Sequence, residues 1–224
     1  MEVVFILVEP GVPRNVGGAA RALKTMGFQH LRIINSNVHN HEEAKWLAHG
    51  SLEILENAEN VPSLNEAIQD IDFLIGTTAK ARSSKKEYYS PAEVGDILRG
   101  KTNSLHKVGI LFGKEESGLN NEDLQKCDIA STIPLKTVFP SLNLAQSVML
   151  YAYELSKENL QSKVTNISKG RIYPTVKSKL VESFNRTTIK NNPVLFNRIL
   201  ERLSVMGDDD LKLILSVIEK FDNK

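Results

Sequence analysis

The stretch VGILFGKEESGL, residues 108–119, contains the pattern that decides the fold. Residues 108–112 are a short apolar run with the length of a buried strand. The run leads directly into a loop between Gly113 and Gly118, where backbone N–H and C=O groups can face a ligand. The loop is neither a GxGxxG motif nor a P-loop, because no GK[ST] follows. An ordinary strand-to-helix turn would have the same appearance, so the neighbouring segments must decide.

Four other segments have the character of strands, and segments with helical character separate them. Strands are expected at residues 3–8, 31–34, 73–77 and 129–133, and helices at residues 16–26, 63–69, from 90 onward and 144–157. This alternation predicts an α/β fold with a mostly parallel sheet and helices on both faces. Ligands of such sheets bind beyond the carboxyl ends of the strands. Residues 9–15, 78–84 and 113–118 each follow a predicted strand, so we expect the site there.

Capping residues mark the starts of the predicted helices. Asn15 is a suitable N-cap for the first helix, which Gly27 should end. Ser63 and Ser90 are each followed three residues later by glutamate, which is the capping-box pattern. Ser141 and Asn143 can cap the helix of residues 144–157, or they can bind a ligand.

Composition limits the class of protein. The only cysteine, Cys127, excludes an intrachain disulfide, and no apolar run reaches the roughly 20 residues of a membrane helix. We therefore expect a soluble, cytoplasmic protein without contact to a membrane. His39, His41 and His49 do not have a zinc-binding spacing, so no metal is expected. Cys127 is interpreted as a small packed side chain.

Charge divides the chain into two parts. Residues 156–224 contain 13 basic and 8 acidic residues, and residues 1–155 contain 15 and 19. We therefore divide the chain into a domain of residues 1–157 and a basic linker with a small helical extension of residues 158–224. Helices of the extension should begin at Asn192 and Asp208. An anionic partner or a solvated linker would each explain the basic stretch.

Two further constellations flank the central stretch. The first is NVGGAAR, residues 15–21, where Arg21 follows a glycine-containing helix start that is suited to phosphate. The second is IPL, residues 133–135, followed by PSLNLAQS, residues 140–147. Each has a plain structural interpretation when taken alone, either as a helix start or as a cap.

Taken together, the three segments resemble the SpoU/TrmH-type RNA 2'-O-methyltransferases of the SPOUT superfamily. That family has N-x-G-x-x-x-R, then L-F-G-x-E-x-x-G-L, then I-P followed by S-L-N, in this order. The stretches GTTAKAR, residues 76–82, and RALKTMGF, residues 21–28, resemble the TrmJ/LasT subgroup. The resemblance covers roughly residues 3–155.

The resemblance implies a C-terminal trefoil knot, which general topology rules would not suggest. It also implies a homodimer whose active site draws on both subunits, and S-adenosylmethionine as the methyl donor. The implied cofactor-binding residues are Thr77, Thr78, Ala79, Gly113, Ile133, Ser141, Leu142 and Asn143.

The implied reaction is attack of a ribose 2'-hydroxyl on the sulfonium methyl group. The implied catalytic residues are Arg21, Asn15, Glu115, Ser141 and Asn143. The family's proposed base is the arginine, but a guanidinium is almost always protonated. Arg21 could instead hold a substrate phosphate, and Glu115 could pair with it across the dimer.

The resemblance favours tRNA, at an anticodon-loop nucleotide, over rRNA as substrate. A non-catalytic RNA-binding protein and a base N-methyltransferase are the alternatives. Arg21 and a basic loop of Lys80, Arg82, Lys85 and Lys86 are the expected RNA contacts, which predicts salt-sensitive binding. Tyr88 and Tyr89 could stack on bases or simply pack.

Overall fold

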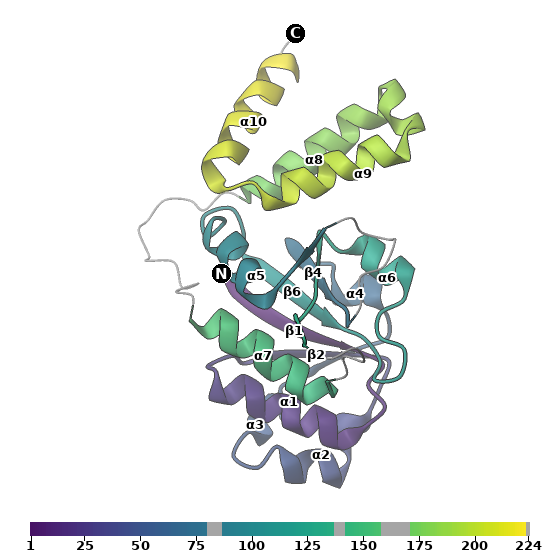
Figure 1. Cartoon of the computed structure of the whole chain (residues 1–224), viewed down its shortest axis with the longest axis vertical. Coiled ribbons are helices and arrows are strands. Elements are labelled where there is room, and N and C mark those ends of the chain that lie inside the picture. The colour runs from purple at the N-terminus through teal and green to yellow at the C-terminus, as the bar shows by residue number, and fades with distance from the viewer. Residues whose placement is uncertain (80–86, 137–141, 158–170, 223–224) are drawn as a thin grey trace.

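The computed structural model describes residues 1–79, 87–136, 142–157 and 171–222, and they form one parallel sheet covered by helices (Figure 1). The strand order is β3-β2-β1-β6-β4-β7-β5, and every pairing is parallel. The strands are β1 (Glu2–Val8), β2 (His30–Ile34), β3 (Glu59–Val61), β4 (Phe73–Thr77), β5 (Tyr88–Tyr89), β6 (Lys107–Phe112) and β7 (Ile129–Ser131). The predicted α/β class with a parallel sheet is confirmed.

Helices lie on both faces of the sheet because strand side chains alternate between two cores. Phe5 and Leu7 of β1 belong to the larger core, and Val4 and Ile6 belong to the smaller one. The helices are α1 (Pro13–Thr25), α2 (Glu42–Leu47), α3 (Leu52–Glu56), α4 (Leu64–Ala67), α5 (Pro91–Arg99), α6 (Asn121–Lys126), α7 (Leu144–Ser156), α8 (Ile172–Asn185), α9 (Pro193–Val205) and α10 (Asp208–Asp222), with the short 3-10 turns η1 (Val38–Asn40) and η2 (Thr188–Asn191). Buried side chains of α1, α5 and α7 fill the larger core, and those of α4 and α6 fill the smaller.

The first helix begins earlier than predicted. α1 starts at Pro13, and its N-cap Val12 makes no side-chain capping bond. Proline suits a first helical turn because its fixed φ is helical and its missing N–H would have no partner there. Asn15 therefore lies within the first turn, and the prediction that it caps the helix was wrong. Gly27, with φ 82°, follows the helix end as predicted.

Ser63 caps α4 by accepting from the Glu66 N–H, which confirms one of the two bonds of the predicted capping box. Ser90 and Asn143 each form a complete capping box, with Glu93 at α5 and Gln146 at α7. The elements that sequence analysis missed are α2, α3, β3, β5 and α8. Most of them have only two to six residues, too few to show a hydrophobic period. The strand predicted to reach Ile133 ends at Ser131.

The position of β7 is unusual for a parallel sheet. β7 pairs with β4 on one side and with β5 on the other. β4 and β5 follow each other along the chain, yet they are not neighbours in the sheet. The later strand β7 lies between them. This strand order is consistent with the trefoil knot that the resemblance implies. The knot itself stays a prediction, because residues 80–86 and 137–141 lie outside the described residues.

Helices α8, α9 and α10 lie together at one end of the molecule (Figure 1). Buried Tyr173 and Val176 of α8 join the larger core of the sheet domain. Asn192 caps α9 by accepting from the Leu195 N–H at 3.1 Å, and α10 begins at Asp208, so both predicted helix starts are confirmed. The predicted linker lies mostly outside the described residues, and the division at residue 157 stays a prediction.

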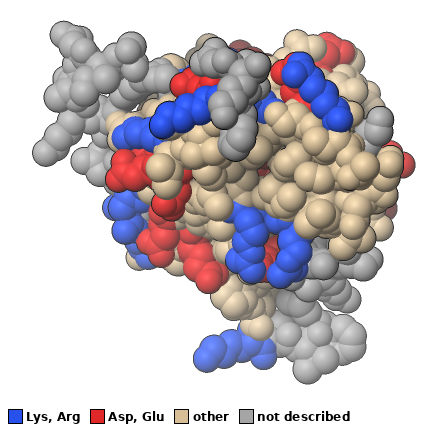
Figure 2. Space-filling view, turned by 90° about the horizontal axis from the view of Figure 1, so that it is seen from above, with Lys and Arg blue, Asp and Glu red and all other residues tan. Residues whose placement is uncertain are grey.

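The face seen from above, where the C-terminal helices lie uppermost in Figure 1, mixes basic and acidic side chains with uncharged areas (Figure 2). The described basic side chains on this face therefore do not form a continuous basic surface in this view. Among the described helices, none is both long enough and apolar enough to cross a membrane.

Candidate cofactor pocket and catalytic residues

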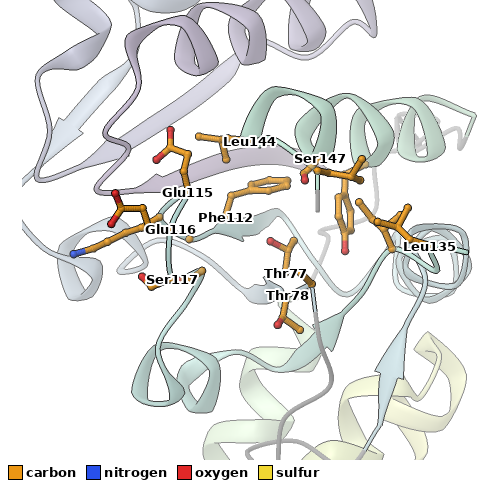
Figure 3. Close-up of a pocket in the computed structure, with 16 residues that line it drawn as sticks. Thr77, Thr78, Phe112, Glu115, Glu116, Ser117, Leu135, Leu144 and Ser147 are labelled. Atoms are coloured by element: carbon orange, nitrogen blue, oxygen red, sulfur yellow. Dashed lines mark hydrogen bonds between the residues drawn. The ribbon is translucent and has the colours of Figure 1, made fainter. Parts of the chain in front are cut away.

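A pocket of about 530 Å³ lies at the carboxyl ends of β4, β6 and β7 (Figure 3). Its size falls within the usual range of small-molecule sites. The lining residues are Thr77, Thr78, Ala79, Phe112, Gly113, Lys114, Glu115, Glu116, Ser117, Gly118, Ile133, Leu135, Leu142, Leu144, Ser147 and Tyr151. Six of the residues expected to bind the cofactor are among them, namely Thr77, Thr78, Ala79, Gly113, Ile133 and Leu142. Strand ends far apart in the sequence thus meet at one edge of the sheet.

Hydrogen bonds fix the three strand ends relative to one another. The Thr77 hydroxyl donates to the Leu111 carbonyl at 2.9 Å, and the Thr78 N–H donates to the Ser131 carbonyl at 2.9 Å. The Tyr151 hydroxyl donates to Ser131 Oγ at 2.7 Å, and burial raises the pKa of Tyr151 well above its ordinary value. This buried network keeps the walls of the pocket rigid.

The loop after β6 depends on its two glycines. A Cβ at Gly113 would lie 2.1 Å from the Gly118 carbonyl carbon and the Leu119 nitrogen, so no larger residue fits. Gly118 has φ 68°, and its N–H donates to the Lys114 carbonyl at 2.8 Å. The loop is therefore a tight turn that presents Glu115, Glu116 and Ser117 at one end of the pocket (Figure 3).

Glu115 connects this loop to the start of α1. Its carboxylate accepts from the Gly11 N–H at 3.0 Å, the Val12 N–H at 3.3 Å and the Asn15 side-chain amide at 3.1 Å. Asn15 and Glu115, both expected in the site, are thus brought together. Three donors already bind this carboxylate. Within the chain it therefore holds the loop after β6 against the β1–α1 connection.

Arg21 stands apart from the pocket. It is exposed on α1 and does not line the pocket of its own chain. Its helix neighbours Gly18 and Ala22 line a second cavity of about 420 Å³ between α1 and α7. Asn143 lines this cavity, and Leu142 lines both.

Several predicted site residues lie outside the described part of the chain. They are Ser141 and the basic loop residues Lys80, Arg82, Lys85 and Lys86. Tyr89 lies in β5, packs against the larger core and donates its hydroxyl to Glu87 at 2.8 Å, so it has the packing role. Cys127 is buried beside Gly76, as predicted for a packed side chain. The described residues contain no group of three or more potential ligands arranged for a metal ion.

Sequence analysis missed several residues of the pocket wall. Tyr151 was placed only within the predicted helix of residues 144–157, and Phe112 only within the predicted strand of residues 108–112. Ser147 and Tyr151 are four residues apart on α7 and therefore share one helix face. Ser147 follows the PSLN segment closely and lies one helical turn before Tyr151. This spacing was the signal in the sequence that could have indicated a shared site. No comparable pattern in the sequence indicated the other pocket residues, which are Lys114, Glu116, Ser117, Leu135 and Leu144.

A parallel sheet with a mixed polar and apolar pocket at its carboxyl edge defines an α/β protein with a candidate small-molecule site. The family model that matches residues 2–153 is the SpoU rRNA Methylase family. The chain belongs to this family.

Relatives support the assignment over most of the chain. LasT of Escherichia coli (strain K12), named as an uncharacterised tRNA/rRNA methyltransferase, is 42% identical over 70% of this chain and 68% of its own length. The tRNA (cytidine-2'-O-)-methyltransferase TrmJ of Methanocaldococcus jannaschii is 33% identical over 91% of this chain and 93% of its own. A probable methylase family protein from Haemophilus influenzae Rd KW20 has a similar structure, with a TM-score of 0.67, 29% identity and coverage of 99% and 97%.

Proposed function

We propose that this protein transfers a methyl group from S-adenosylmethionine to a ribose 2'-hydroxyl of tRNA. The observation that carries the proposal is the convergence of six motif residues on one pocket at the carboxyl edge of the sheet. Membership of a methylase family supplies the reaction class. The alignment with TrmJ of M. jannaschii, which covers 91% of this chain, favours tRNA over rRNA. A protein that modifies tRNA would work in the cytoplasm.

The pocket suits S-adenosylmethionine on three counts. Apolar side chains of Ile133, Leu135 and Leu142 can cover the faces of an adenine ring. Thr77, Thr78 and the loop after Gly113 offer polar groups for the ribose and the methionine part. Bound there, S-adenosylmethionine would supply an electrophilic methyl group.

The chain's own residues would position the acceptor. In the transfer, the ribose oxygen forms a bond to the methyl carbon as the carbon–sulfur bond breaks, and the hydroxyl proton leaves. Arg21 is exposed, and a guanidinium is suited to hold an RNA phosphate that orients the hydroxyl. The hydroxyl proton would then be lost late in the transfer or to water. Asn143 lies beside Leu142 at the wall shared by the two cavities and is proposed to orient the ribose.

A homodimer would complete this site. The cavity between α1 and α7 is lined mainly by apolar groups, including Ala145, Met149 and the partly exposed Leu150. A second copy covering this groove would remove that apolar surface from water. Because Arg21 lies beside the groove and outside its own pocket, a second copy would bring each Arg21 toward the other copy's pocket. Lys80, Arg82, Lys85 and Lys86 follow the pocket residue Ala79 in sequence and are proposed to contact RNA phosphates.

The decisive experiment is transfer of labelled methyl groups from S-adenosylmethionine to unmodified bulk tRNA and, separately, to rRNA, followed by nucleoside analysis. We expect label in 2'-O-methylnucleosides from tRNA. The phosphodiester bond that follows such a nucleotide resists alkaline hydrolysis, because the 2'-hydroxyl that would attack it is methylated. Label only in rRNA would keep the chemistry and change the substrate. Label in a base would show that the protein is a base N-methyltransferase and not a ribose methyltransferase. Binding of S-adenosylmethionine without any methyl transfer would indicate a non-catalytic RNA-binding protein.

A further inference from the structure

Two non-glycine residues at the carboxyl edge of the sheet have left-handed backbones. Glu9 follows β1 with φ 44°, and Asn35 follows β2 with φ 49°. They are neighbours, because Val8 and Ile34 are in register and the Glu9 N–H donates to the Ile34 carbonyl at 3.0 Å. Asparagine tolerates this conformation well, whereas for glutamate it is a local strain. Such strain persists where surrounding contacts demand it, often near a functional site.

The strained backbone directs the Glu9 carboxylate to two partners. It forms an ion pair with Lys114, and the Asn35 side chain also hydrogen-bonds it. The hydrogen bond from Lys114 is the largest cause that holds the pKa of Glu9 below its ordinary value. Lys114 in turn lines the proposed cofactor pocket. The pair therefore connects the end of β1 to the wall of that pocket.

Lys114 and its neighbour Glu115 fasten the same loop at two places. Lys114 reaches Glu9 at the start of the β1–α1 connection, and Glu115 accepts from Gly11 and Val12 further along it. The two attachments use opposite charges on consecutive residues. The backbone of Lys114 is also held, because its carbonyl accepts from the Gly118 N–H. The pocket-lining residues 115–117 therefore lie between Lys114 and Gly118, which are joined by this backbone hydrogen bond.

We propose that Glu9 and Lys114 are a positioning pair that holds the glycine loop of residues 113–118 in the shape needed to bind S-adenosylmethionine. The proposal rests on the proposed function and adds three residues, Glu9, Asn35 and Lys114, to those assigned above. The pair acts through the loop and does not touch the reacting atoms. Since the same connection leads into α1, the pair also fixes the start of the helix that carries Arg21 relative to the pocket.

A surface ion pair without a role is the alternative. The two side chains are 37% and 48% exposed, and pairs in such positions usually contribute little to stability. The two interpretations differ in what glycine at position 9 would do. Glycine adopts a positive φ without strain, so Glu9→Gly removes both the strain and the carboxylate. A positioning pair then predicts opposite effects on stability and on cofactor binding.

The test measures the Kd for S-adenosylmethionine by titration calorimetry and the melting temperature for wild type, Glu9→Gly, Glu9→Gln, Lys114→Met and the double variant Glu9→Gln/Lys114→Met. We expect each single variant to bind about threefold or more weakly, with Glu9→Gly melting no lower than wild type. We expect the double variant to bind S-adenosylmethionine no more weakly than the weaker-binding of its two single variants. The effects of two residues that act as a pair on the binding free energy do not add. Lys45→Met is the control, since Lys45 pairs with Glu42 on α2, away from the pocket.

A second measurement reports on the loop without ligand. Hydrogen exchange of the Gly118 amide should become faster in Glu9→Gln and stay unchanged in Lys45→Met. Wild-type Kd values in Glu9→Gly and Glu9→Gln would overturn the positioning pair and leave the proposed function intact. A wild-type protein that does not bind S-adenosylmethionine would contradict the proposed function and the pair together.

Discussion

Arg21 is the residue on which the proposed chemistry depends most, and its side chain is exposed on α1. Asn15 and Glu115 contact each other, whereas Arg21 lies beyond them on α1. An arginine side chain is effectively always protonated. Holding a phosphate therefore requires less free energy than acting as a base, which would need the neutral form.

Replacing Arg21 should therefore impair transfer and leave cofactor binding intact. We expect Arg21→Ala to lower kcat about 100-fold or more, with a Kd for S-adenosylmethionine within about twofold of wild type. Arg21→Lys should recover part of the loss, because charge remains and the two-pronged geometry does not. Single-turnover methyl transfer to tRNA measures both. Near-wild-type turnover of Arg21→Ala would contradict both roles considered for this residue.

His39 is a buried polar residue through which the stability of the fold should depend on pH. It is 8% exposed, its Nδ1 has no hydrogen-bond partner among the described residues, and burial lowers its pKa. Because the pKa is lower in the folded chain, the unfolded chain binds more protons as pH drops below about 6.5, and the free energy of unfolding should fall. Urea denaturation between pH 5 and 7 should show this slope reduced in His39→Leu. An equal slope in both proteins would contradict the prediction, and exposed His49→Leu is the control.

At the scale of elements, the site is made of strand ends and the turns that follow them. β4, β6 and β7 set the floor of the pocket, and α7 supplies one wall through Ser147 and Tyr151. Regular hydrogen bonding fixes these elements, whereas the turn after β6 depends on the absence of a side chain at Gly113.

Gly113→Ala should therefore damage the site more than the fold. Its Cβ would meet backbone atoms at 2.1 Å, so the turn must move away from the pocket. A displacement of about 1 Å typically costs on the order of 100-fold in rate, and we expect a loss of that order in methyl transfer. Gly100→Ala is the matched control, because the nearest atom to its Cβ would lie at 3.5 Å, an ordinary contact. Equal activity of the two variants would contradict this account of the turn.

At the scale of the whole molecule, buried charges dock the C-terminal helices onto the sheet domain. Asp72 pairs with Arg171, and Asp128 accepts from the Tyr173 hydroxyl at 2.6 Å. Lys101 is fully buried, donates to the Met206 carbonyl and lies 4.8 Å from the centre of the Tyr173 ring. Asp128 directly precedes β7, so this docking surface and the pocket lie at opposite ends of one strand.

The docking should depend on pH through Lys101. Burial lowers its pKa to about 8, although Asp208 and Asp128 act in the opposite direction. Between about pH 8 and pH 10.5 the unfolded state binds more protons than the folded state, so the free energy of unfolding should rise with pH across this window. Denaturant unfolding of wild type and Lys101→Met checks this. We expect the rise to be smaller in the variant, and identical pH profiles would contradict it.

The groove between α1 and α7 gives a prediction about assembly. Leu150 lines it and is 36% exposed, so Leu150→Arg should place a charge in the proposed dimer contact. We expect sedimentation velocity to show a dimer for wild type and a monomer for this variant, with activity lost. Leu213→Arg is the control, because Leu213 is 65% exposed on α10 and does not line the groove. A wild-type monomer with full activity would contradict the shared site.

The sequence by itself determined the features that depend on near neighbours in the chain. The apolar runs that became β1, β2, β4 and β6, the caps at Ser90 and Asn143 and the glycine turn after β6 all follow from spacings of two to five residues. Motif order was enough to predict which strand ends would share a pocket, because parallel strands place their carboxyl ends on one edge.

Only the tertiary structure decided how distant charged groups pair. The contacts of Glu115 with Asn15, Lys114 with Glu9 and Arg171 with Asp72 each join residues about 100 positions apart, and no local pattern encodes such a pairing. The same holds for the burial of Lys101 and for the insertion of β7 between β4 and β5. Periodicity reports which side of an element is apolar, but the partner of a charge depends on which surfaces the folded chain brings together.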